Sequence, residues 1–524
     1  METVTEQNQV YELLYIMDVK GILPLYLNTM LPKTRKEIGE YLILVREKDM
    51  KLTRAEKDFL TKFENEFIHE INPSSEDNSV LLKSPLFKDF FSDKEKYLYE
   101  FRDSILTCYV EGLASIDYRL DSINSSRKRN VTLAEIGLRL RGTVKNDLGY
   151  SFRATNGKIF GNRNLALSDP RLQGNVKFND LKDNYFDFVE AYLRADLDWF
   201  DLQFGREQLL MGTGYSDRLL LSNNAPVFDA IKLDFHHKWF RFTFIHGSLV
   251  NDSIFSSDVK VNKYFAMHRA EFSIGEFINV GLSEMIIYQR QAMEFAYLNP
   301  INFYKSSEHS LKDRDNAFVS LDLQIFPLSN YKLYGTWLID DIDFGKMGTG
   351  WWGNEFGWQG GIYVTNMGNI DDVDALIEYT RIEPYVYSNR IAGNNYSHKS
   401  ISLGHHIGPN SDEWLFEMLY RPMSRLRTRL GFSIMRHGMN YDENGNFVNV
   451  GGDVLIGHSD SDSETVKFLG GILEKTSRLR FRFDYEPINN FFISGMYEYS
   501  NLKFANRLYK TEDHFAALRI FVEY

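Results

Sequence analysis

Cysteine is almost absent from this chain of 524 residues, which contains only Cys108. A single cysteine cannot form an internal disulfide or a cysteine-based metal site. No run approaches the roughly 18 consecutive apolar residues that a membrane-spanning helix requires, and the mean hydropathy is −0.35. The N-terminus, METVTEQNQVYELL, has neither the basic nor the apolar region of a signal peptide. The chain is therefore either cytosolic or exported, with a signal peptide already removed from this sequence.

Positive charge is also scarce, because 60 Lys and Arg face 72 Asp and Glu and leave a net charge of −12. This acidic balance argues against binding to nucleic acid. Neither a G-x-S-x-G nor an H-E-x-x-H motif occurs, so no hydrolase is indicated. Aromatic residues, in contrast, are abundant and make up 15% of the chain. A soluble core rarely needs so many rings, whereas a transmembrane β-barrel carries aromatic girdles at both membrane interfaces.

Residues 1–98 have the pattern of a small helical bundle. Apolar residues recur at helical spacing from Val10 to Met17. Thr34 with Glu37, and Thr53 with Glu56, match the capping box that opens a helix. Charged residues fill the opposite faces. We therefore expect a helical segment at 1–98 that lies on the periplasmic side of a barrel or plugs it.

From about residue 102 the apolar period changes from 3.6 to 2, which indicates β-strands. AFVSLDLQIF (317–326) and RLRFRFDY (478–485) alternate apolar and polar residues throughout. A half-buried sheet of a β-sandwich would give the same alternation. The polar face, however, is dense in Arg, Asp, Glu and Lys, as expected for the water-filled lumen of a barrel. The outward, lipid-facing set then includes Leu321, Leu323, Phe481, Phe483, Ile520 and Val522.

The connections between strands alternate between short turns and long loops. HHKW (236–239) and EPINN (486–490) are short. The long connections are expected at 206–228, 248–264, 288–315, 341–355, 387–411, 437–463 and 502–512. Short periplasmic turns and long extracellular loops are typical of outer-membrane barrels. Counting by parity predicts about 18 antiparallel strands over residues 99–524, if 464–486 is a single strand that includes Leu469.

The last strand, FAALRIFVEY, alternates to the end of the chain and finishes on Tyr524. It resembles the C-terminal signal that the outer-membrane barrel assembly machinery reads. A terminal ring also suits an interfacial aromatic belt. We therefore expect the bacterial outer membrane as the location, with outer-membrane lipid and the assembly machinery as partners.

Four segments together resemble the Wzi-like capsule-assembly outer-membrane proteins. They are FGRE (204–207), GTGYSDRLLLSNNAP (212–226), YLNPINFY (297–304) and LGHHIGPNSD (403–412). The resemblance covers most of the expected barrel. It implies an 18-stranded outer-membrane barrel that acts as a lectin for surface polysaccharide, helps to organise capsule, and is not an enzyme.

The segment 204–226 carries the candidate site. Asp217, Arg218, Asn223 and Asn224 offer the bidentate groups that sugar hydroxyls need. Rings that could stack on sugar are Tyr215, Trp351, Trp352, Tyr297 and Tyr304. A structural alternative is that Gly205, Gly212 and Gly214 let the loop fold into the lumen, where ion pairs brace it. We expect Arg206 and Glu207 to brace, and the residues from Asp217 to Asn224 to bind.

Three further motifs resemble cofactor or metal sites. GTGWWG (348–353) matches a dinucleotide fingerprint, but strands flank it and no helix follows. His236–His237 and His405–His406 are neighbours that would point to opposite faces of a strand, so neither pair would chelate one metal. Asp340, Asp341 and Asp343 could hold Ca²⁺ but lack a ligand loop of known spacing. We expect no cofactor and no metal.

A porin or sugar channel is the main alternative function, and a barrel enzyme without a recognisable motif is a third. A porin needs an open lumen, whereas a capsule lectin can be plugged. Single-channel conductance therefore separates the first two hypotheses.

Overall fold

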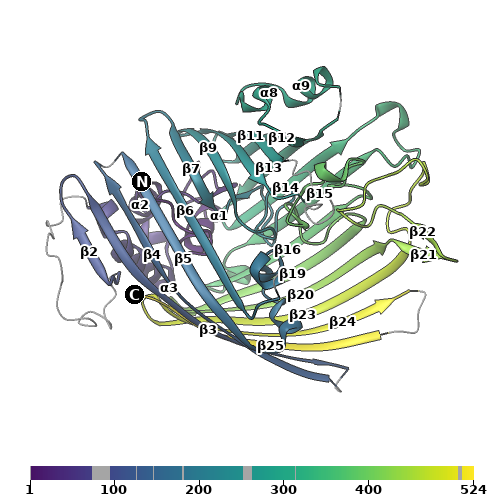
Figure 1. Ribbon diagram of the computed structural model, residues 1–524. Helices are drawn as coiled ribbons and strands as arrows, with labels where there is room; N and C mark the ends of the chain where they lie inside the picture. Colours follow the sequence, from purple (N-terminus) through teal and green to yellow (C-terminus); the bar gives the residue numbers. More distant parts are fainter. Residues whose placement is uncertain are drawn as a thin grey trace.

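The computed structural model describes residues 2–72, 95–124, 127–145, 147–179, 182–251, 262–312, 314–505 and 510–524 (Figure 1). Residues 73–94 of the expected helical segment lie outside these ranges, as do 252–261 and 506–509 of two expected loops. Within the described ranges, no helix has both the length and the apolar character needed to cross a membrane.

Eighteen strands of the described residues form one closed antiparallel barrel, which confirms the expected fold and strand number. Each strand pairs with the next along the barrel, and β25 closes the barrel against β3. A short strand, β2 (Tyr99–Arg102), adds to the start of β3. The barrel strands are β3 (Thr107–Ile123), β4 (Arg127–Val144), β5 (Leu148–Gly161), β6 (Tyr185–Asp196), β7 (Asp201–Glu207), β9 (Phe228–His237), β10 (Phe240–Leu249), β11 (Asn262–Ile274), β12 (Ile278–Arg290), β13 (Asn316–Leu328), β14 (Tyr331–Asp341), β15 (Glu355–Val364), β16 (Val373–Ile382), β19 (Ser411–Met423), β20 (Leu426–Met439), β23 (Ile472–Ile488), β24 (Phe491–Phe504) and β25 (Lys510–Glu523).

The two faces of the barrel wall differ as the alternation predicts. On β13, Leu321 and Leu323 are exposed, whereas the alternate residues Ser320 and Asp322 are almost fully buried. Phe481 and Ile520 are exposed on other strands in the same way. A closed barrel with an apolar outside and a polar inside spans a membrane, and bacterial barrels of this kind lie in the outer membrane.

Two expected boundaries differ from the structure. The strand expected at 464–486 begins only at Ile472. Leu469 has a φ of 59°, and its N–H donates to Asn410 Oδ1 at 2.7 Å, so it belongs to the preceding loop. The long loop expected at 502–512 is a short connection, since β24 ends at Phe504 and β25 begins at Lys510. Neither error changes the number of strands.

The N-terminal helices lie inside the barrel, at the end where both chain termini are found (Figure 1). Both expected capping boxes open helices, with Thr34 at α2 and Thr53 at α3. The helices share an apolar core of their own. Glu12 on the first helix contacts Arg427 and Arg429 of the wall, each at 3.0 Å. The helices are α1 (Val10–Val19), α2 (Arg35–Arg46), α3 (Arg54–Glu66) and α4 (Ile68–Ile71), with a 3₁₀ turn at Asp49–Lys51.

Long connections at the other end carry short elements of their own. Residues 162–179 fold into the lumen, where Leu165 and Phe178 pack against Val131 and Phe186. The remaining elements are α5 (Arg163–Ala166), α6 (Pro170–Gln173), α7 (Val176–Asn179), α8 (Phe295–Leu298), α9 (Tyr304–Ser310), β17 (Ser397–His398), β18 (Ile401–Ser402), β21 (Tyr441–Glu443), β22 (Asn446–Val448) and 3₁₀ turns at Phe344–Lys346, Met367–Asn369 and Ala392–Asn394.

Candidate functional site

The segment that joins β7 to β9, residues 208–227, folds into the lumen. Its short strand β8 (Leu210–Met211) pairs with β1 (Met30–Leu31) of the N-terminal segment. Leu219, Leu220 and Leu221 are buried in an apolar cluster inside the barrel. This inward loop therefore joins the helices below it to the wall around it.

Glycine is required at two points of the inward loop. Gly212 has a φ of 124°, a conformation that side chains with a Cβ rarely adopt. A Cβ at Gly214 would lie 2.0 Å from the carbonyl oxygen of Asp217. Gly205 has a φ of 142° on β7, directly before the loop. The inward folding that the structural alternative described for these glycines is the arrangement in the structure, whereas an extracellular loop facing outward was expected for residues 206–228.

Asp217 is the centre of a polar cluster that is largely buried, although the side chain of His406 is 40% exposed. Its Oδ2 accepts from Asn224 Nδ2 at 3.0 Å and from the backbone N–H of His406 at 2.7 Å. Nδ1 of His406 lies 2.9 Å from the same oxygen, and its Nε2 lies 3.4 Å from Glu413 Oε2. We call Asp217, Asn224, His405, His406 and Glu413 the Asp217 cluster. It joins the inward loop to the connection 383–410.

The protonation of the two histidines follows from these contacts. Withdrawal from bulk water acts against charge on His406, but its bonds to Asp217 and Glu413 outweigh this effect and raise its pKa to about 9. Burial lowers the pKa of His405 to about 4, although Asp217 acts in the opposite direction. Burial also acts against charge on Asp217, but the two histidines hold its pKa well below the usual range. At neutral pH the cluster is therefore an ion pair between Asp217 and His406.

His405 and His406 do not lie on a strand, so the expectation that they point to opposite faces is wrong. The pair lies in a loop, and the two rings stack with centroids 4.7 Å apart. Together with Asp217 they form one of the two His–carboxylate groups in the described residues whose ligand atoms lie close together. Both nitrogens of His406 face carboxylates, which requires a protonated ring without a free lone pair. The group therefore fits an ion pair better than a metal.

The second such group is Asp201, Asp234 and His236. Arg194 lies 2.6 Å from Asp201, and Arg241 pairs with Asp234, so arginines already neutralise both carboxylates. His236 and His237 are exposed at the end of β9, as expected for a turn. Asp340 and Asp343, two of the three aspartates considered as Ca²⁺ ligands, bind different backbone groups. Asp340 accepts from the Tyr387 N–H at 2.6 Å, whereas Asp343 accepts from the Gly345 N–H at 2.9 Å.

Arg206 and Glu207 are on opposite faces of β7. Arg206 points outward and pairs with Asp229 at 2.6 Å, with both side chains about half exposed. It therefore lies outside the inward loop and does not hold it in the lumen. Glu207 points inward, where it accepts from Gln203 Nε2 at 2.8 Å and from the Thr3 hydroxyl. Glu207 thus fixes the N-terminal segment.

The candidate rings outside the inward loop are already packed against protein. Trp352 stacks on His458 with centroids 3.8 Å apart, and Lys346 covers Trp351 at 3.8 Å from its ring. The contact between Trp352 and His458 joins the connections 342–354 and 440–471. Tyr297 and Tyr304 are fully buried. None of the four has both ring faces free for a sugar.

A recess of about 710 Å³ remains between the helices, the inward loop and the wall. Tyr215, Arg218 and Asn223 of the candidate residues line it, whereas Asp217 and Asn224 do not. Sequence reasoning missed most of its remaining surface, which is rich in arginine. The lining arginines are Arg35, Arg139, Arg141, Arg153, Arg218, Arg427, Arg429, Arg482 and Arg519.

Water reaches the wall of the recess. The inward-facing side chains of Arg480 and Arg482 on β23 are 53% and 48% exposed. In the described residues, no carboxylate lies within 4.0 Å of the guanidinium of Arg218 or Arg519. Burial and the neighbouring Arg269 lower the pKa of Arg218 to about 10, so it is charged at neutral pH. The recess thus presents two charged donors without an ionic partner.

Comparisons with known proteins agree with this architecture. A family model described as capsule assembly protein Wzi matches residues 124–517. A search of curated protein sequences finds no match. Wzi of Escherichia coli, whose structure is described as that of a carbohydrate-binding β-barrel and outer-membrane protein involved in group 1 capsule assembly, superposes with a TM-score of 0.62 at 11% identity. The alignment covers 100% of this chain and 99% of that chain.

Two further solved structures give lower TM-scores. A BenF-like porin from Pseudomonas fluorescens has a TM-score of 0.47 at 8% identity, over 80% of this chain and 99% of that chain. OccK5 (OpdH) of Pseudomonas aeruginosa has a TM-score of 0.44 at 9% identity, over 79% of this chain and 98% of that chain.

Proposed function

Since the chain belongs to the capsule assembly protein Wzi family, we propose that it binds surface polysaccharide and helps to organise it at the cell surface. The solved relative from Escherichia coli is described as carbohydrate-binding, which supports this proposal.

The recess is the proposed saccharide site, and its lining is the observation that carries the proposal. Arg218 and Asn223 offer the paired donors and acceptors that sugar hydroxyls and carboxylates need. Tyr215 lines the same space and is half-buried, so part of its ring can pack on sugar C–H groups, whereas Tyr363 is almost fully buried against it. Water-exposed arginines along β23 give a polysaccharide strand a polar path toward the recess.

Asp217 and Asn224 take a different part in this proposal from the one expected from the sequence. Both are engaged within the Asp217 cluster, so they brace the inward loop and orient the residues beside them. Arg218 follows Asp217 directly, and its backbone N–H donates to Asp217 Oδ1 at 2.8 Å. Bracing by Asp217 therefore fixes where Arg218 lies.

A diffusion porin is the alternative function, and the water-exposed arginines favour it to the same degree. Against it, the helices of segment 1–98 lie in the lumen, and we propose that this segment is a plug. The buried ion pairs of Glu12 with the wall support a resident plug.

The test is the double variant Arg218→Ala with Asn223→Ala in the full chain. We expect cell-associated polysaccharide to fall and binding of the purified glycan, measured by calorimetry, to be lost, while thermal unfolding stays close to wild type. Asp217→Ala with Asn224→Ala should instead lower the unfolding temperature. Arg206→Ala is the matched control, because its exposed pair with Asp229 is worth little. Unchanged retention and binding in a correctly folded Arg218 and Asn223 variant would refute the recess as the site.

A further inference from the structure

Residues 291–312, 314 and 315, which we call the outer loop, lie against the outside of the barrel rather than inside it. Ala317 shares the outward face of β13 with Val319 and Leu321, yet it is only 5% exposed because the outer loop covers it. The strand register extends this face across β12 and β11, through the pairs Ile286–Ala317 and His268–Glu284. Figure 1 shows α8 and α9 beside β11 and β12, at the rim of the barrel.

The wall beneath the outer loop carries polar side chains where lipid-facing residues are expected. His246, His268 and Glu284 all point outward by register. The outer loop satisfies Glu284, whose two carboxylate oxygens accept from the N–H groups of Tyr304 and Lys305, each at 2.7 Å. A charged group on the lipid face is destabilising, so covering these residues suits a membrane wall.

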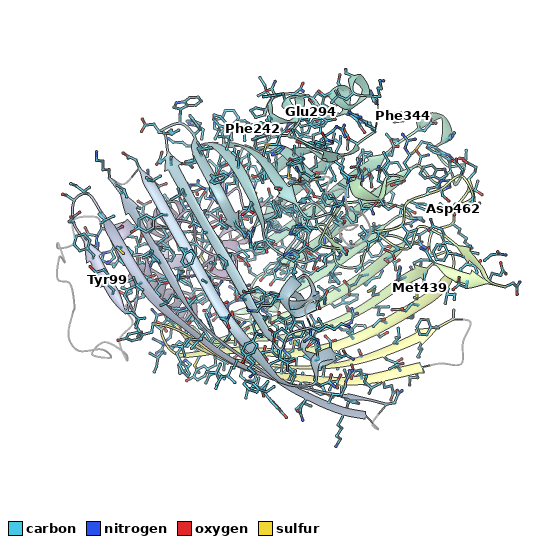
Figure 2. The ribbon with its side chains drawn as sticks, in the orientation of Figure 1. Tyr99, Phe242, Glu294, Phe344, Met439 and Asp462 are labelled. Carbon is cyan, nitrogen blue, oxygen red and sulfur yellow. The ribbon has the colours of Figure 1, made fainter. Side chains whose placement is uncertain are left out.

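Tyrosine rings form the contact between the outer loop and the wall. Tyr304 lies over His268 with ring centroids 4.5 Å apart, and Tyr297 lies 4.9 Å from Tyr288. Tyr297 also donates to Asp315 Oδ2 at 2.8 Å. Figure 2 labels Glu294 of the outer loop and Phe242 of β10 along this edge, and Phe242 packs against the same aromatic cluster.

The other side of the outer loop is apolar and uncovered. Phe295 is 85% exposed, Ile301 84% and Phe303 60%, with Met293 beside them. Four large apolar side chains on one short segment form the kind of patch that marks an interaction site. The patch continues the lipid-facing surface of the wall, because Leu282 and Leu321 of β12 and β13 are exposed on the same outward face.

We propose that the outer loop is a membrane-contacting element, with Phe295, Ile301 and Phe303 in contact with the acyl chains of the outer leaflet. The loop begins after Arg290 and ends before Asn316, so it lies level with the extracellular ends of β12 and β13. This is the interfacial region, where short helices with one apolar face lie in the plane of the membrane. Backbone groups outside the two short helices can still be hydrated at that depth.

The test uses the full chain with Cys108→Ser and one new cysteine, Ile301→Cys, that carries an environment-sensitive fluorophore. The protein is refolded into phosphatidylcholine vesicles with or without bromine near the glycerol end of the acyl chains. We expect brominated lipid to quench the label and aqueous iodide to quench it little. Heat-modifiable migration on gels verifies that the barrel has folded.

Asn446→Cys is the matched control, since it lies on the exposed hairpin of β21 and β22, which projects away from the wall (Figure 1). Its label should be quenched by iodide and not by brominated lipid. Iodide quenching of the Ile301 label without quenching by brominated lipid would overturn the proposal. Protection from both quenchers would also overturn it, because another protein surface would then cover the patch.

Discussion

Asp217 and His406 are 189 residues apart in the chain, yet the carboxylate of one lies 2.9 Å from the ring nitrogen of the other. The contact fastens the inward loop to the connection 383–410, and Asn224 completes it from the same loop. Because Arg218 is the next residue after Asp217, the ion pair also determines which groups face the recess.

This ion pair predicts a defined pH dependence of stability. The pKa of His406 is raised to about 9, above the ordinary value of about 6.5. A raised pKa means that the stabilisation is complete below about pH 6.5 and is lost as the pH rises through 9. Asp217, with a lowered pKa, loses its contribution only as the pH falls into the acid range.

The measurement is the difference in unfolding temperature between wild type and His406→Gln across the pH range. We expect it to be largest near pH 6 and to shrink toward zero above pH 9. His237→Gln is the control, because His237 is exposed at the end of β9 and should show no such trend. A difference that grows with rising pH would show that His406 is neutral in the folded protein.

The plug gives a second prediction. Glu12 faces Arg427 and Arg429 at 3.0 Å and Arg421 at 3.7 Å, all largely buried. Glu12→Gln leaves these guanidinium groups without their shared carboxylate, and breaking a buried pair costs about 3–5 kcal/mol. The helices should loosen, and single-channel conductance in a planar bilayer should rise from a low wild-type value. Glu40→Gln, an exposed change on α2, should leave conductance unchanged. Steady high conductance of the wild-type protein would favour the porin alternative.

Much of the fold could be predicted because strand alternation is a local property. Leu321 and Asp322 show their faces through neighbours two residues away, and turn residues fix the connections. The capping boxes at Thr34 and Thr53 are local in the same sense. The prediction that Leu469 lies in a strand was wrong because the alternation of apolar residues continues into a loop, where the backbone of Leu469 adopts a positive φ.

The site was less predictable, since it depends on contacts between distant segments. Nothing near Asp217 in the chain indicates that His405 and His406 meet it. Tyr297 and Tyr304 look like sugar platforms until the outer loop folds onto the wall. The sequence does contain one signal for this packing: His268 and Glu284 occupy outward strand positions where apolar, lipid-facing residues are expected.

The lipid-facing wall gives a third prediction. Leu323 is exposed on the outward face of β13, and arginine near the bilayer midplane costs roughly 2–4 kcal/mol. Leu323→Arg should therefore lower the free energy of unfolding from lipid vesicles by about that amount. Leu328→Arg, at the end of the same strand, should cost only about 0–1 kcal/mol, as expected near an interface. Equal effects at the two positions would contradict the depth that the barrel assigns to them.

Tyr524 gives the last prediction, which separates assembly from stability. Its backbone N–H donates to Gly112 O at 2.9 Å, and the Gly112 N–H donates back to Tyr524 O, so it extends the seam between β25 and β3. Tyr524→Ala keeps both backbone bonds and removes only the terminal ring. We propose that the assembly machinery reads this ring, so surface levels in cells should fall several-fold while unfolding in detergent changes little. Tyr524→Phe retains a ring and should restore surface levels. If Tyr524→Ala instead lowers surface level and stability together, and Tyr524→Phe rescues both, the ring acts by packing at the seam and not as an assembly signal.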